Sequence, residues 1–165
     1  MGKISKKSLL FTFIALSICF AIFLFYLKIG DFNDFSDKYV NGIYISRVAS
    51  WTAYNEYGID YYNLVKKATT NDTDAIRTIV LLNLNGKSTS AFIYHSAVII
   101  GLIELVGEDK IIYSLRTISK EQQLNIWLNI YEGMGNASWV YEDYPRLTGK
   151  SAEEAFPKIY AFIHE

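Results

Sequence analysis

The residues of this chain that could carry out acid–base, nucleophilic or metal chemistry are few and poorly spaced for it. His95 and His164 have no histidine or glutamate three or four positions away, the spacing at which metal-binding helices carry their ligands. Cys19 is the only cysteine, so residues 31–165 contain neither a disulfide nor a thiol nucleophile. The sequence therefore predicts no metal, no cofactor and no catalytic residues.

The tripeptide Gly-Lys-Ser occurs at residues 86–88 and 149–151, and phosphate-binding loops end in the same three residues. Such a loop also needs a glycine five residues before its second glycine, so that backbone amides can surround the phosphate. Leu81 and Tyr144 occupy those positions here. Both tripeptides are therefore interpreted as turns that precede helices.

The adjacent carboxylates Glu142–Asp143 and Glu153–Glu154 could act as acid–base pairs. The first pair lies in an expected loop and the second opens an expected helix, where acids favour the helix dipole, so we expect both on the solvated surface. We expect His95 to be buried and hydrogen-bonded in a structural role. If any of these side chains were catalytic, the protein would be an envelope hydrolase or lytic enzyme that uses Glu104, Glu142 or His95. This is the alternative to the binding function developed below.

Aromatic residues are more informative, because they make up 16% of the chain and gather beside acids in two clusters. Tyrosine and tryptophan bury a large area at low entropic cost, so they are enriched in protein interfaces. An exposed acidic and aromatic surface suits a basic protein partner. The predicted partner-binding residues are Trp139, Tyr141, Glu142, Asp143, Tyr144, Trp51, Tyr54 and Tyr57. The alternative is that most of these side chains complete the core of a small domain.

An uncharged run at residues 9–27 is long enough to cross the hydrocarbon core of a bilayer as a helix. Lysines precede this run and acids follow it, so the positive-inside rule places the N-terminus in the cytoplasm. We predict a single-pass anchor within residues 1–30, in the cytoplasmic membrane of a bacterium, and an extracytoplasmic domain of residues 31–165. Cleavage, which would give a periplasmic or secreted protein, and lipidation at Cys19 are the alternatives.

The charge of the domain also limits its partners. Residues 31–165 carry twelve basic and seventeen acidic side chains, which gives a net charge of −5. Nucleic acid is not an expected partner, because phosphate binding needs a clustered basic face.

Apolar residues recur at helical spacing through residues 31–165, which predicts an all-α domain. We expect a compact bundle of about five to seven helices, with a helix-pair solenoid as the alternative. The expected helices cover residues 35–57, 61–68, 73–84, 89–106, 109–117, 120–133 and 152–163. A short strand is the alternative for residues 42–48.

Three further predictions concern single segments of the domain. The helix over residues 89–106 is apolar nearly all round, so we expect it at the centre of the core, and a second membrane span is the alternative. Residues 133–149 are expected to form an irregular, aromatic loop that belongs to the partner surface. The helix after the Ser119–Gln122 capping box is expected to bury Leu124, Trp127, Leu128 and Tyr131.

The sequence thus favours a non-enzymatic, membrane-anchored module that binds another protein outside the cytoplasmic membrane. An immunity or inhibitor protein is one concrete version of this function. A small subunit of an envelope complex is the other.

Overall fold

The computed structural model describes residue 14, residues 16–20 and residues 35–165. Of the predicted membrane anchor, only residues 14 and 16–20 are among these, and they are helical; the rest of that prediction lies outside the described residues. The chain divides into two compact units, Met1–Ser36 and Asp37–Glu165, and the second unit contains all of the described hydrophobic core.

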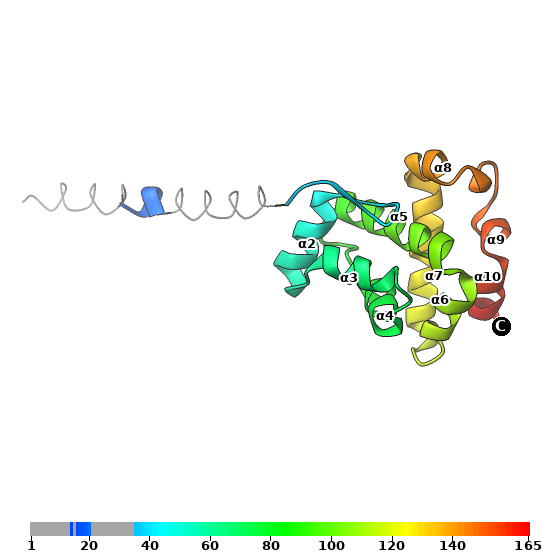
Figure 1. Cartoon of the computed structure of the whole chain (residues 1–165). Helices are drawn as coiled ribbons and strands as arrows, with labels where there is room; N and C mark the ends of the chain where they lie inside the picture. Colours follow the sequence, from blue (N-terminus) through cyan, green and yellow to red (C-terminus); the bar gives the residue numbers. More distant parts are fainter. Residues whose placement is uncertain (1–13, 15, 21–34) are drawn as a thin grey trace, which may run out of the picture. The chain divides into compact units, whose positions relative to one another are not determined.

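Residues 35–165 are mostly helical, which confirms the all-α prediction (Figure 1). Most of the expected helices are present, and the structure adds one short hairpin and several short helices. The elements are β1 (Lys38–Val40), β2 (Ile43–Ile45), α2 (Arg47–Tyr57), α3 (Tyr61–Ala68), α4 (Thr73–Leu81), α5 (Thr89–Val106), α6 (Glu108–Leu115), α7 (Lys120–Asn136), α8 (Trp139–Asp143), the 3-10 helix η1 (Pro145–Leu147), α9 (Ala152–Ala155) and α10 (Pro157–His164).

Side-chain caps start several helices where the sequence predicts them. Asp60 accepts a hydrogen bond from the backbone N–H of Asn63 at the start of α3. Ser119 forms the expected capping box with Gln122 at the start of α7, and Ser151 forms a second capping box with Glu154 at the start of α9. Pro157 then starts α10 as a new helix, so the expected helix over residues 152–163 is divided into α9 and α10.

Helix α5 lies at the centre of the core, where it contacts α2, β2, α6, α7 and α8. By length and composition it is the one helix in the described part of the chain that could cross a membrane. Ten of its eighteen residues are nevertheless buried by its neighbours. This burial confirms the prediction of a central core helix.

Helices α5 and α7 pack tightly at Gly133. A Cβ atom at this position would lie 2.7 Å from Cδ1 of Ile100 and 3.0 Å from Cβ of Ser96. Glycine is therefore needed here for packing. It does not end the helix as expected, because α7 continues to Asn136.

The expected helix over residues 35–57 is wrong in its first part, where β1 and β2 form an antiparallel hairpin. Asn41 and Gly42 join the strands and have φ values of 49° and 88°. A two-residue type I′ turn requires positive φ at both positions, and Asn-Gly is its preferred pair. The strand alternative for residues 42–48 is thus correct over Ile43–Ile45.

Helix α7 buries a different face from the one predicted. Ile126, Ile130 and Met134 are buried, whereas Leu124, Leu128 and Tyr131 are exposed. The buried stripe is the one that contains Gly133, where α7 packs tightly against α5.

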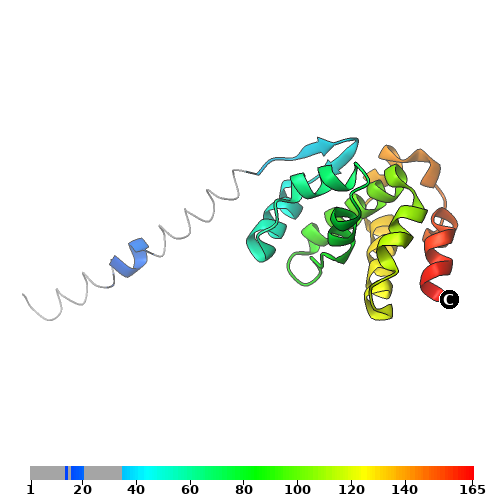
Figure 2. The same cartoon turned by 60° about the horizontal axis from the view of Figure 1, so that its bottom comes forward.

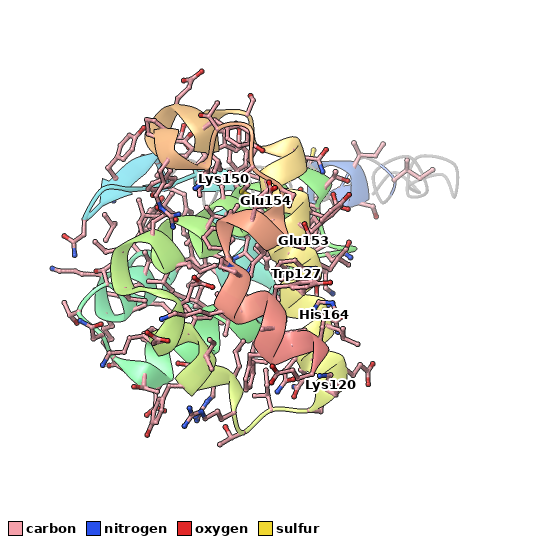
Figure 3. The ribbon with its side chains drawn as sticks, turned by 90° about the vertical axis from the view of Figure 1, so that its right-hand side faces the viewer. Lys120, Trp127, Lys150, Glu153, Glu154 and His164 are labelled. Atoms are coloured by element: carbon pink, nitrogen blue, oxygen red, sulfur yellow. The ribbon has the colours of Figure 1, made fainter. Side chains whose placement is uncertain are left out.

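Trp127 lies between these two faces of α7 and packs against α10. Its ring centroid is 5.2 Å from that of Tyr160 and 5.6 Å from that of His164 (Figure 3). Of the four side chains expected inside, only Trp127 is therefore partly buried.

Residues 133–149 do not form the expected irregular loop, because α7 extends into this segment and α8 and η1 occupy most of the rest. Val140 and Leu147 are buried and hold these short helices against the core.

Helix α4 ends at Leu81, a few residues before its expected end at residue 84.

Candidate functional site

An open pocket of about 270 Å³ lies where the hairpin meets α5 and α8. Figure 2 shows the hairpin next to α8, which follows α7 along the chain. We call this hollow the acidic aromatic pocket, because its lining consists of four aromatic rings and two carboxylates. The lining residues are Tyr39, Tyr44, Tyr94, Trp139, Glu142 and Asp143.

The hairpin turns two tyrosines toward this pocket. Tyr39 and Tyr44 are directly opposite each other on β1 and β2, and their ring centroids are 5.4 Å apart. Successive side chains of a strand point to opposite faces, so Ile43 and Ile45 enter the core on the other side. The alternation of the strand therefore separates core residues from pocket residues.

Helices α5 and α8 continue this row of rings. Tyr94 on α5 lies 6.0 Å from the ring of Tyr44 and 5.0 Å from the ring of Trp139 on α8. Tyr44, Tyr94 and Trp139 are each partly buried, whereas Tyr39 is 65% exposed at the outer end of the row. Four rings from three separate segments thus form one contiguous surface.

The charge of the pocket is negative. Glu142 and Asp143 are exposed at the end of α8, and no lysine or arginine lines the pocket. Burial, followed by the nearby Asp37 carboxylate, raises the pKa of the Tyr44 phenol. The tyrosine therefore stays neutral at physiological pH, and the pocket's charge comes from its carboxylates.

Trp139 is fixed by ring contacts rather than by a hydrogen bond. Its indole Nε1 is buried and has no hydrogen-bond partner within the described residues. A buried donor without a partner costs about 1–3 kcal/mol, so the polar end of this side chain does not stabilise the fold.

Tyr141 and Tyr144 were also expected at the partner surface, and they lie beside the pocket rather than in its lining. The Tyr141 hydroxyl donates a hydrogen bond to the Met134 carbonyl at 2.7 Å, which ties α8 to the end of α7. The Tyr144 hydroxyl packs over Gly101 and leaves no room there for a Cβ atom. Burial, with help from Asp143, raises the pKa of Tyr144 to about 12.

The other predicted aromatic cluster lies on α2 and does not line this pocket. Tyr54 and Tyr57 are exposed, and Trp51 is partly buried. The Tyr57 hydroxyl donates to the Asn83 carbonyl at 2.6 Å and so connects α2 to the segment after α4. The structure therefore brings together Trp139, Glu142 and Asp143 from the predicted set, but not the α2 residues.

Sequence reasoning missed Tyr39, Tyr44 and Tyr94. Tyr39 and Tyr44 lie within the expected helix over residues 35–57, and Tyr94 lies within the expected core helix over residues 89–106. The turn pair Asn41-Gly42 between alternating residues was the signal that could have revealed the hairpin and its shared face.

The residues considered for a hydrolase have three different environments. His95 is fully buried, and its Nδ1 and the Tyr61 hydroxyl are hydrogen-bonded at 2.5 Å, so the expected burial and hydrogen bonding of this histidine are confirmed. Burial lowers the pKa of His95 to about 4, so its imidazole is neutral. Glu104 pairs with Arg146, and Glu142 lies in the acidic aromatic pocket.

A second hollow of about 230 Å³ lies between the end of α4, the start of α5 and α7. Its polar lining is made of side-chain amides, and none of its lining residues is ionisable. The amide residues are Asn83, Asn85, Gln122, Asn125 and Asn129. This hollow has no charge with which to select a charged partner.

No protein-family model, curated protein or solved structure matches this chain. Its function must therefore be inferred from the chemistry of its own surface.

Proposed function

We propose that this protein is a non-enzymatic, membrane-anchored module that binds a basic protein outside the cytoplasmic membrane. The observation that supports the proposal is the acidic aromatic pocket, where β1, β2, α5 and α8 present four rings and two carboxylates on one open surface. Exposed rings provide contact area, and uncompensated carboxylates attract and orient a partner of opposite charge. The net charge of −5 on residues 31–165 favours the same class of partner.

Residues 9–27 are proposed to hold the domain at the membrane, with the N-terminus in the cytoplasm. Alkaline phosphatase fused after Glu165 should then be active, and the full-length fusion should stay in the membrane fraction. An inactive phosphatase would contradict this topology. An immunity or inhibitor protein and a subunit of an envelope complex both satisfy the proposal, and the identity of the partner will separate them.

Site-specific photo-cross-linking in cells that naturally make the protein tests the binding function. A photoreactive amino acid replaces Tyr39, which is 65% exposed in the pocket, or Tyr113 on α6, which is 58% exposed and does not line it. We expect one basic protein to be cross-linked from position 39 and not from position 113. Absence of an adduct at position 39, or the same adduct from both positions, would refute the proposal.

A further inference from the structure

We infer that the acidic aromatic pocket takes the guanidinium of one arginine side chain of the basic partner, an inference that rests on the function proposed above. The pocket is lined by Tyr39, Tyr44, Tyr94 and Trp139 and by the carboxylates of Glu142 and Asp143. The composition of this lining determines the charge of the group it binds, and its geometry determines the shape of that group.

The lining selects a cation. The faces of aromatic rings carry partial negative charge and attract cations, most strongly when the ring is tryptophan. Two carboxylates at the edge of the same pocket add full negative charges, and no basic residue of the lining neutralises them. An anionic group would be repelled, and a purely apolar group would leave the carboxylates uncompensated.

Basic side chains near the pocket are engaged elsewhere. Lys38 precedes Tyr39 on β1, and the alternation of the strand turns it to the opposite face, where its Nζ lies 4.5 Å from the centroid of the Tyr62 ring. Arg146, which follows α8 in η1, pairs with Glu104. The pocket is therefore open to a cation from another molecule.

The shape of the site favours guanidinium over ammonium. The rings are flat surfaces tilted against one another by 56° between Tyr39 and Tyr44 and by 33° between Tyr94 and Trp139. A planar guanidinium can stack on one such ring and still direct N–H donors sideways to a carboxylate. Adjacent acids at the end of α8 offer acceptors for this arrangement, whereas a lysine ammonium is a compact point charge that cannot stack.

The test measures binding of N-acetyl-L-arginine amide to the full-length protein in a maltoside detergent, which carries no cation of its own. The indole N–H signal of Trp139, identified by its loss in Trp139→Phe, reports binding in a proton–nitrogen NMR spectrum. We expect a saturable shift with a midpoint on the order of millimolar, as for a single side chain without its protein. N-acetyl-L-citrulline amide, a neutral analogue of similar shape, should bind at least about tenfold more weakly.

Two pairs of variants assign the effect to the pocket. Glu142→Gln with Asp143→Asn keeps the shape and removes the charge, so it should weaken arginine binding about tenfold or more. The matched control, Glu121→Gln with Glu165→Gln, removes two exposed carboxylates that do not line the pocket and should leave binding unchanged. Tyr39→Ala should weaken binding, and Tyr113→Ala should not.

Four results would overturn the inference: no saturable shift up to about 50 mM, equal binding of the arginine and citrulline amides, tighter binding of N-acetyl-L-lysine amide, or tighter binding of tetramethylammonium. The last would indicate a quaternary ammonium, such as a lipid headgroup, as the occupant. These failures are distinguishable from failure of the proposed function. A protein cross-linked at position 39 without arginine binding refutes only the inference, whereas arginine binding without a cross-linked protein refutes the proposed function.

Discussion

Tyr61 and Tyr39 show how differently one residue type is used in two regions of this molecule. Tyr61 is fully buried in the core, and its hydroxyl is hydrogen-bonded to Nδ1 of His95. Tyr39 is 65% exposed, and its ring begins the row that lines the acidic aromatic pocket. The core thus uses the polar group of a tyrosine, whereas the pocket uses the face of its ring.

The role of each aromatic residue in this chain therefore depends on the groups that surround its ring. In the core, a polar atom without a partner is costly, and the hydrogen bond between the Tyr61 hydroxyl and His95 Nδ1 gives both of these atoms a partner. In the pocket, the charged neighbours Glu142 and Asp143 are exposed and contribute little to the fold. Substitutions in the core should therefore change stability, and substitutions in the pocket should change binding.

The largest expected effect on stability comes from Gly133→Val at the contact between α7 and α5. Its Cβ would overlap Ile100 and crowd Ser96, so the two central helices would have to separate. We expect a loss of about 3 kcal/mol in the free energy of unfolding and a fall of about 10 °C in Tm. Gly135→Val on the same helix is the matched control, because nothing lies within 4 Å of its Cβ position. Equal melting temperatures of the two variants would contradict the tight packing of α5 against α7 at Gly133.

Acid should destabilise the core through His95. Its pKa is about 4 in the folded protein and 6.5 in the unfolded chain, so the unfolded state binds more protons between these values. Stability is full above pH 6.5 and falls as the pH drops toward 4, by about 2 kcal/mol between pH 7.5 and pH 5. Urea unfolding of residues 37–165 at these two pH values measures this loss. The loss of stability at pH 5 should disappear in His95→Gln and remain in His164→Gln. A loss that persists in His95→Gln would show that another group causes it.

The smallest expected effect on stability comes from replacing tyrosine with phenylalanine, a substitution that can be made in both regions. Tyr61→Phe removes the hydrogen-bond partner of a buried histidine nitrogen and should cost about 1.5 kcal/mol. Tyr39→Phe keeps the ring, has no hydroxyl hydrogen bond to lose among the described residues, and should leave stability unchanged. Chemical denaturation of both variants checks this, and a larger loss for Tyr39→Phe would place that tyrosine in the core.

Local signals in the sequence are sufficient for most of the fold. Capping residues define the starts of α3, α7 and α9, and an uninterrupted apolar run identifies α5 as the core helix. These features depend on interactions within a few residues, which a single sequence contains. The Asn41-Gly42 turn is equally local, but four-residue spacing of apolar residues across it favoured a helix instead.

The remaining features depend on contacts between distant segments. Helix α7 carries two apolar stripes, and the buried one is the stripe that packs against α5 at Gly133, a contact between segments far apart in the sequence. The acidic aromatic pocket likewise combines Tyr39, Tyr94 and Trp139 from three segments. Trp139, Glu142 and Asp143 could be selected by composition, but the tyrosines that complete the surface could not be joined to them without the tertiary structure.

The most direct test of the central claim is capture of the native partner by tagged full-length protein from detergent-solubilised membranes. Wild type is compared with Glu142→Lys plus Asp143→Lys, and with Glu121→Lys plus Glu165→Lys, which changes the net charge equally away from the pocket. We predict that one basic protein is captured in stoichiometric amount by wild type and by the control pair, and is lost from the pocket pair. Equal capture by all three proteins, or loss from both charge-reversed pairs alike, would contradict the assignment of the binding surface to the acidic aromatic pocket.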